Sequence, residues 1–332
     1  MNRPTLEAVA ALAGVGRGTV SRVINGSPNV STKARDAVQQ AIAELGYVPN
    51  RAARTLVTRR TDTVALVVSE SELRVFDEPY FAGTIRGIGS ALAETGLQLI
   101  LAMAQSPEEH ERLEHYLTGQ HVDGVLMLSL HGADPLPGRL EAMGVPTVLG
   151  GRPVGLDPFS YVDMDNRAGA RQAVKYLLGK GRRGIATIAG PQDMGVGVDR
   201  LAGYRDALLA SGLPELVAYG DFSEESGASA MRELLEAHPD LDAVFAASDL
   251  MAVGAMRTLR DKGRSIPGDV AVVGFEDSKV ALHTNPPLTT VHQPTEAMGR
   301  QMAQLLVARI NGEELRQPVV ILDTYLVPRE SA

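Results

Sequence analysis

The chain has 332 residues, of which 44% are hydrophobic and 22% charged, a balance typical of a globular protein of about two domains. It contains no cysteine, which excludes disulfides, thiolate metal sites and cysteine nucleophiles, and no apolar run reaches the roughly 20 residues that span a bilayer. Residues 1–60 carry nine Lys or Arg but three Asp or Glu, so the formal net charge of −8 hides a basic head on an acidic body. Such a head indicates binding to a polyanion. The first residues lack the pattern of a signal peptide, and we therefore expect a cytoplasmic protein.

Three short helices are predicted in the basic head. Thr5 can cap the first helix, and Gly14-Val15-Gly16 ends it. The second helix is predicted from Arg17 to Ile24, and Ser31 can cap a third that runs to Leu45. Two helices joined by a glycine-containing turn form the helix-turn-helix arrangement of DNA-binding proteins.

Three motifs in this region carry a family resemblance. They are T-L-E-A-V-A-x-x-A-G-V from Thr5, T-V-S-R-V-I-N-G from Thr19, and L-G-Y-V-P-N-R-A-A-R-T-L from Leu45. With them the chain resembles the lactose-repressor/galactose-repressor family of bacterial transcription regulators. The resemblance implies that the second helix lies in the major groove, where Arg22 and Arg17 read bases.

The resemblance also implies phosphate contacts, and the chain departs from the family at two positions: Gly16 stands where the family has a serine helix cap, for which glycine is acceptable, and Gly18 is the second. Gly18 stands where the family has a polar base reader, so specificity is predicted to depend mainly on Arg17 and Arg22. The residues assigned to DNA are Thr5, Arg17, Gly18, Thr19, Ser21, Arg22, Asn25, Asn50, Arg51, Ala53, Arg54 and Leu56.

The segment from Asn50 to Val57 has helical composition but spans only about eight residues, and isolated helices below roughly 12–15 residues are marginal in water. In the family, two such hinge helices pair over the operator centre, which implies that Leu56 wedges into a base step and that Arg51 and Arg54 reach phosphates. We expect this helix to form only while two copies hold one duplex. The alternative is a solvated linker, which would tolerate Leu56→Ala.

From Asp62 onward, apolar runs alternate with amphipathic segments. The strand-like runs are Val64–Val68, Leu97–Met103, Val122–Leu128, Val145–Leu149, Ile185–Ile188, Ala243–Ala246 and Val270–Phe275. The helix-like segments are Phe81–Glu94, Pro107–Gln120, Arg167–Leu178, Arg200–Ala210, Ser223–Ala237, Leu250–Asp261 and Thr295–Ile310. This alternation predicts parallel sheets covered by helices, and the length favours two lobes.

The resemblance implies an all-α helix-turn-helix head plus an α/β body with two doubly wound parallel-sheet lobes, the periplasmic-binding-protein type I fold. The expected domains are residues 1–49 for the DNA-binding head, 50–61 for the hinge and 62–332 for the body. Within the body, we expect the N-lobe at about 62–162 and 292–322 and the C-lobe at about 163–291 and 323–332.

Ligands of doubly wound folds bind outside the carboxyl ends of the strands. Tyr80 and Phe81 stand at such a turn, after a loop (Ser69–Glu78) that is longer than usual in the family. Asp199-Arg200 and Ser248-Asp249 match further family signatures. The resemblance assigns ligand contacts to Tyr80, Phe81, Ser129, Met164, Arg200, Phe222, Ser248, Asp249, Glu276 and Gln293. For each of these residues alone, a structural role is the alternative.

An arginine fork, carboxylates, an amide and aromatic faces suit the hydroxyl groups and C–H faces of a sugar. Gly151 stands where sugar-binding members of the family have an acid, which leaves room for a larger saccharide. The chain as a whole resembles regulators of cellulose and cello-oligosaccharide utilisation. His110 and His115 are five residues apart rather than the four of zinc metalloproteases, and no phosphate loop or catalytic triad is present. We therefore predict no cofactor, no metal site and no enzyme activity.

Together these features predict a homodimeric, sequence-specific DNA-binding repressor of carbohydrate utilisation genes. A small saccharide such as cellobiose or a related oligosaccharide would release it from a palindromic operator. Three alternatives remain: a secreted sugar-binding protein of a transporter, an enzyme on the same fold, and a regulator whose ligand is a corepressor. The chain shows no heptad tail, so a dimer is expected rather than a tetramer.

Overall fold

The structure, a computed structural model, describes residues 4–24, 26–48, 60–104, 106–155 and 160–332. The chain separates into two compact units, residues 1–61 and 62–332. Among the described residues, no helix combines the length and the apolar character that crossing a bilayer requires.

The first unit contains the three predicted helices. They are α1 (Leu6–Ala13), α2 (Arg17–Ile24) and α3 (Thr32–Leu45). The side chains of Thr5 and Ser31 cap α1 and α3, and Gly14 and Gly46 end these helices in the left-handed conformation, with φ of 64° and 60°. Val9, Val20 and Val38, one from each helix, are buried against one another in a small core. The helix-turn-helix prediction is confirmed for this unit.

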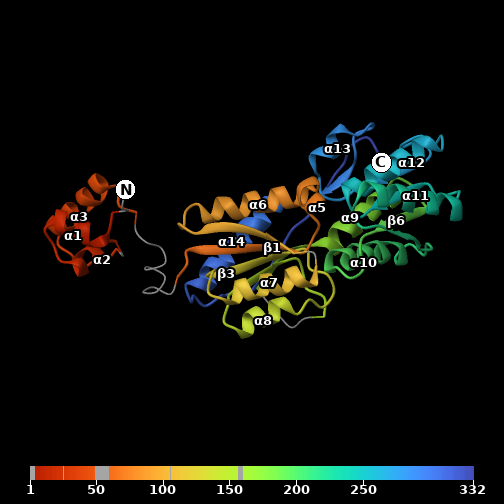
Figure 1. Cartoon of the computed structure of the whole chain (residues 1–332). Helices are drawn as coiled ribbons and strands as arrows, with labels where there is room; N and C mark the ends of the chain where they lie inside the picture. Colours follow the sequence, from red (N-terminus) through yellow and green to blue (C-terminus); the bar gives the residue numbers. More distant parts are fainter. Residues whose placement is uncertain (1–3, 25, 49–59, 105, 156–159) are drawn as a thin grey trace. The chain divides into compact units, whose positions relative to one another are not determined.

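The second unit has two lobes, the first of which is built on a six-stranded parallel sheet in the order β11-β5-β4-β3-β1-β2. Its strands are β1 (Thr63–Val68), β2 (Gln98–Met103), β3 (Gly124–Leu128), β4 (Thr147–Gly150), β5 (Ser160–Met164) and β11 (Val319–Leu322). Helices α6 (Pro79–Leu92) and α14 (Thr295–Ile310) cover one face, and α7 (Pro107–Thr118) and α8 (Leu136–Ala142) cover the other (Figure 1). Successive side chains of β1 therefore enter different cores. Leu66 belongs to the core under α6 and α14, and Val67 to the core on the opposite face of the sheet, under α7 and α8.

The second lobe has a four-stranded parallel sheet in the order β7-β6-β8-β9. Its strands are β6 (Ile185–Ala189), β7 (Leu216–Tyr219), β8 (Ala243–Ala246) and β9 (Ala271–Val273). Helices α9 (Asn166–Gly179) and α10 (Gly195–Leu209) cover one face, and α11 (Glu224–Ala237) and α12 (Asp249–Asp261) cover the other. The lobe also contains α13 (Lys279–His283) and an antiparallel pair of strands, β10 (Thr290–His292) and β12 (Tyr325–Val327). The predicted fold class, with two parallel-sheet α/β lobes, is confirmed.

Two sequence predictions differ from the structure in this unit. The segment Ser69–Glu78, expected as a loop, contains the short helix α5 (Glu72–Asp77), which Ser71 caps by accepting a hydrogen bond from Arg74 N at 3.3 Å. Helix α10 begins at Gly195 rather than at Arg200. A Cβ at Gly195 would lie 2.3 Å from the carbonyl oxygen of Arg152, so only glycine fits where the two lobes meet.

Candidate ligand pocket and DNA-binding helix

A pocket lies between the two lobes and is lined by side chains from both of them. Residues that follow the carboxyl ends of strands from both lobes line it: Ser129 after β3, Met164 at the end of β5, Met194 after β6 and Phe222 after β7. The pocket therefore occupies the position that doubly wound folds use for ligands.

Arg200 is the central cation of the pocket. It projects from α10, is 2% exposed, and donates from Nε to Asn166 Oδ1 at 3.0 Å and from Nη1 to the carbonyl oxygen of Ala247 at 2.5 Å. Its guanidinium stacks 3.8 Å above the ring centre of Phe275. Burial lowers the pKa of Arg200 to about 10, so the side chain remains charged at neutral pH. Among the described residues, Nη2 of this fork makes no hydrogen bond and is available to a ligand.

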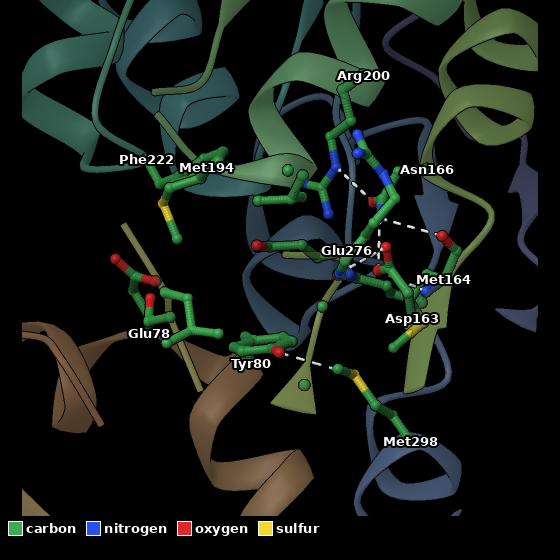
Figure 2. Close-up of a pocket in the computed structure, with 18 of the residues that line it drawn as sticks. Glu78, Tyr80, Asp163, Met164, Asn166, Met194, Arg200, Phe222, Glu276 and Met298 are labelled. Carbon is green, nitrogen blue, oxygen red and sulfur yellow. Dashed lines mark hydrogen bonds between the residues drawn. The ribbon is translucent and has the colours of Figure 1, made fainter. Parts of the chain in front are cut away.

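Asp163 and Asn166 lie beside Arg200, and together these three residues form a polar end of the pocket (Figure 2). The carboxylate of Asp163 accepts hydrogen bonds from the backbone nitrogens of Met164 at 2.7 Å and Arg152 at 3.0 Å, and from Asn166 Nδ2 at 3.0 Å. Burial nevertheless raises the pKa of Asp163 to about 6. The network fixes the orientation of the Asn166 amide, because its oxygen accepts from Arg200 while its nitrogen donates to Asp163.

One acceptor in the pocket, on Gln293, has unmet hydrogen-bonding capacity, and Glu276 stands beside it. Gln293 is 5% exposed, and its Oε1 is buried with no hydrogen-bond partner among the described residues. Glu276 stands beside it with a φ of 127°, in a strained backbone region, and its carboxyl group lines the pocket. Burial and the nearby carboxylate of Asp249 raise the pKa of Glu276 to about 8. An unpaired buried polar group costs about 1–3 kcal/mol, so the amide oxygen of Gln293 indicates a ligand that supplies the missing partner.

Aromatic and thioether side chains form the apolar walls. Tyr80 and Phe81 stand at the start of α6 and meet edge to face, with ring centres 5.2 Å apart. Phe222 and Met194 of the other lobe line the same pocket and lie across it from Tyr80 (Figure 2). Phe222 has a φ of 74°, and its ring lies where a Cβ of Gly190 would stand, only 2.4 Å away. Gly190 therefore leaves room for the ring that closes this side of the pocket.

The structure brings eight of the ten predicted ligand residues to the pocket wall: Tyr80, Phe81, Ser129, Met164, Arg200, Phe222, Glu276 and Gln293. It does not bring Ser248 and Asp249 there. Ser248 caps α12 and donates to the carbonyl oxygen of Phe222 at 3.2 Å. Asp249 is fully buried and accepts from Thr290 Oγ1 at 2.5 Å and from Ser278 N at 2.8 Å. Both residues support the pocket from behind.

Sequence reasoning missed several polar lining residues, namely Arg74, Glu78, Arg152, Asp163 and Asn166. Asp163 and Asn166 lie close to the predicted Met164, Asp163 on the short strand β5, which was not predicted, and Asn166 at the start of α9. Arg152 pairs through two nitrogens with Asp199 of the opposite lobe, at 3.0 and 2.7 Å. Within the described residues, no three His, Asp or Glu side chains gather in a way that could hold a metal ion.

In the head, α2 presents a polar face opposite its buried Val20. Arg17 and Arg22 are exposed on it, and Gly18 and Ser21 lie between them at helical spacing. Arg17 forms an exposed ion pair with Glu7 at 3.1 Å, which is worth little in water and leaves Arg17 free to turn to another anion. Arg22 donates from Nε to the carbonyl oxygen of Gly18 at 3.2 Å.

The remaining residues predicted to contact DNA fall into two groups. Thr5 caps α1 at the surface, and Thr19 is half-buried on α2. Asn25, Asn50, Arg51, Ala53, Arg54 and Leu56 lie outside the described residues, and with them the predicted hinge helix.

Comparison with known proteins identifies both units. Residues 5–50 match the model of bacterial regulatory proteins of the lacI family, and residues 174–332 match a periplasmic binding protein-like domain. The chain is 63% identical over 334 residues to the HTH-type transcriptional regulator CelR of Thermobifida fusca, covering 99% of this chain and 98% of the relative. It is 35% identical to the ribose operon repressor of Escherichia coli (strain K12), with 99% of both chains covered.

Solved structures agree with these matches. A transcriptional regulator CelR–cellobiose complex superposes with a TM-score of 0.80 at 60% identity, covering 99% of this chain and 100% of the other. The lac repressor dimer bound to operator and the anti-inducer ONPF gives a TM-score of 0.87 at 28% identity, with 99% of both chains covered. The match of the head separates this chain from a transporter's sugar-binding protein, which the body fold alone would allow. The chain belongs to the lacI family of bacterial regulatory proteins and is a helix-turn-helix transcriptional regulator.

Proposed function

We propose that this regulator represses genes of cello-oligosaccharide utilisation and that cellobiose, or a closely related saccharide, releases it from its operator. The observation that carries the choice of ligand is the buried amide oxygen of Gln293, which has no partner among the described residues and stands in the wall of the inter-lobe pocket. A sugar hydroxyl can donate to it, and other hydroxyls can accept from Arg200 Nη2.

The charge of the pocket favours a neutral ligand. Its lining contains three arginines, Arg74, Arg152 and Arg200, and three acids, Glu78, Asp163 and Glu276. Two of the three arginines are already paired with acids, Arg74 with Glu70 and Glu78 and Arg152 with Asp199, so the lining offers little free positive charge to an anionic ligand such as a sugar phosphate. A neutral polyol with apolar C–H faces matches both the paired charges and the walls made by Tyr80 and Phe222.

The comparisons support the same effector. The CelR of Thermobifida fusca is 63% identical along the whole length, and the complex of a CelR contains cellobiose. We propose that the eight predicted residues at the pocket wall contact the saccharide here, together with Asp163 and Asn166. Ser248 and Asp249 are proposed to act by positioning Phe222 and Glu276.

On DNA, we propose that two copies bind a palindrome, with the polar face of α2 in the major groove. Arg22 and Arg17 would read guanines, and Thr5, Thr19 and Ser21 would hold the backbone. We further propose that residues 50–57 become a paired helix on the operator, with Leu56 in the central base step and Arg51 and Arg54 on phosphates. The protein would act in the cytoplasm, by binding rather than by catalysis.

Regulation then follows from linked equilibria. A saccharide held by residues of both lobes favours the arrangement in which the two lobes are closed on it. It can weaken DNA binding only by the ratio of its affinities for the DNA-free and the DNA-bound protein. By the same linkage, operator DNA must weaken saccharide binding equally.

Fluorescence anisotropy on an operator selected by the protein from random DNA tests this function. We expect cellobiose to weaken operator binding at least tenfold, and we expect Gln293→Met, which retains the volume but not the acceptor, to lose most of this response. Arg22→Ala should lose discrimination between operator and random DNA. Stronger operator binding with cellobiose would make the saccharide a corepressor, and no response across a saccharide panel would refute the proposed effector class.

A further inference from the structure

The inter-lobe pocket has a second polar end, formed by α5 and the residues beside it. Glu70, Arg74 and Glu78 are spaced four residues apart, so they lie on one side of this helix and its flanks. Arg74 donates from Nη1 to Glu70 Oε2 at 2.8 Å and from Nε to Glu78 Oε1 at 2.7 Å. Val75 is buried in the core of the N-lobe and anchors the helix. The guanidinium is therefore held in one position before any ligand binds.

This end lies away from the polar end around Arg200. Figure 2 shows Glu78 on one side of the pocket and Asp163 and Asn166 on the other, with Tyr80 between them. Arg74 and Glu78 both line the pocket, as do the apolar side chains of Phe222 and Met194. The pocket therefore offers polar groups at both ends and an apolar middle, which is the pattern that two linked sugar rings present.

The free atoms at this end suit hydroxyl groups. In the part of the chain that the structure describes, Arg74 Nη2 and Glu78 Oε2 make no hydrogen bond, so this end of the pocket offers one donor and one acceptor. Burial raises the pKa of Glu78 even with Arg74 beside it. Asp221 of the C-lobe also interacts with Arg74, so the one guanidinium faces three acids, Glu70, Glu78 and Asp221. An anion would find the charge of Arg74 already paired with acids here, whereas neutral hydroxyls need no free charge.

We propose that Arg74 and Glu78 bind the second ring of a disaccharide and make this regulator select a disaccharide over a monosaccharide. The inference rests on the proposed function. It adds that the residues at α5 let the protein distinguish a longer saccharide from a shorter one. The ring nearer Arg200 would be bound equally in either ligand, and the outer ring would be bound by Arg74 of α5 and by Glu78, which follows it.

Calorimetric titration of the full-length protein with cellobiose and with glucose tests the proposal. Two conservative variants are used: Arg74→Lys keeps the charge but loses the fork, and Glu78→Gln keeps the shape but loses the anionic acceptor. The matched controls are Arg86→Lys and Glu296→Gln, because these residues form an Arg–Glu pair at 2.7 Å in the same lobe but do not line the pocket. Thermal unfolding of every variant shows whether α5 and the lobe stay folded.

We expect wild type to prefer cellobiose over glucose by at least a hundredfold. Arg74→Lys and Glu78→Gln should lose tenfold or more in affinity for cellobiose while their affinity for glucose changes less than twofold, and the controls should bind as wild type. Equal losses for both sugars, or unchanged cellobiose binding in both folded variants, would overturn the inference and leave the effector class standing. If the wild-type protein bound no saccharide, both this inference and the proposed function would fail.

Discussion

The imidazole of His131 in the N-lobe lies 2.8 Å, from Nδ1, from the carboxylate oxygen Oδ2 of Asp193 in the C-lobe. Its Nε2 lies 3.1 Å from Glu70 Oε1 in its own lobe, and Arg74 reaches the other oxygen of Glu70 at 2.8 Å. Because both ring nitrogens face carboxylates, both must carry hydrogen, which is the charged form. The hydrogen bond with Glu70, aided by that with Asp193, raises the pKa of His131 to about 8.

This bridge predicts that saccharide affinity depends on pH. The pKa of His131 lies above its ordinary value of about 6.5, so the stabilisation of the closed lobes is complete below that pH and is lost as the pH rises through about 8. The ring is 35% exposed and Glu70 remains beside it in either arrangement, so solvent screening limits the effect. We expect affinity for cellobiose to fall about three- to tenfold between pH 6.5 and pH 9.

Two variants outside the pocket lining serve as controls for this prediction. His131→Gln retains hydrogen bonding without titrating, and Asp193→Asn removes the charge in the other lobe, so both should lose the part of the pH dependence that comes from the bridge. The part that comes from Glu276, whose pKa is also about 8, should remain. NMR titration of the seven histidines without ligand should show the pKa of His131 falling in Asp193→Asn. A His131→Gln protein with the pH profile of wild type would rule out the bridge as the cause.

Strong periodicities in the sequence predicted most of the fold. The alternating strands and helices of the body, and the capped helices of the head, follow from local patterns that tertiary contacts reinforce. Shorter elements did not emerge, because β5 and β11 have five and four residues and gain their stability from pairing with neighbouring strands, β11 with β5 and β5 also with β4. Helix α5 was also missed, although the spacing of Glu70, Arg74 and Glu78 by four residues was a visible signal.

The pocket was only partly predictable from the sequence. The motif around Arg200 and the aromatic pair at Tyr80 mark strand ends, and the structure places both at the pocket wall. Ser248 and Asp249 occupy a similar strand end, but their side chains turn back to bond Phe222 and Ser278. The direction in which a side chain turns depends on residues far away in the chain, which no local motif encodes.

Arg200→Lys is predicted to abolish most saccharide binding. A lysine cannot reproduce the two bonds to Asn166 and Ala247 while leaving a further nitrogen for the ligand, nor the stacking on Phe275. We expect a loss of affinity of about a hundredfold and a decrease in unfolding free energy of about 2 kcal/mol. Calorimetry and urea denaturation measure these, with Arg205→Lys as the control.

Arg205 is a suitable control because it lies on the same helix, is about half exposed and pairs with Glu215 at the surface. Its replacement should change neither quantity measurably. Wild-type saccharide affinity in a folded Arg200→Lys protein would contradict the central position assigned to this guanidinium.

Glu276→Gln is predicted to stabilise the ligand-free protein at high pH while weakening saccharide binding. Burial and Asp249 raise the pKa of Glu276 to about 8, so its contribution to stability is fully present below the unfolded value of about 4.5 and is lost as the pH rises through about 8. A neutral amide removes this loss, and Tm should rise by about 2–4 °C at pH 8 but hardly at pH 5. Glu236→Gln, an exposed carboxyl on α11, controls for the change in net charge. The same gain at both pH values would refute the assignment.

Gly18→Ala is predicted to stabilise the DNA-binding head without weakening operator binding. Gly18 lies inside α2 with a helical φ, and a Cβ there would meet only Arg22 Nη2, at an ordinary 3.9 Å. Alanine in a helix interior is favoured over glycine by about 1 kcal/mol, partly through the unfolded chain. Hydrogen exchange of the α2 amides should slow about fivefold, and operator anisotropy should be unchanged. Gly14→Ala is the matched control, because its φ of 64° strains any side chain although the space around it is open. Gly14→Ala should speed amide exchange in α1 and α2. If Gly18→Ala also exchanged faster than wild type, α2 would need glycine at this position for a reason other than helix propensity.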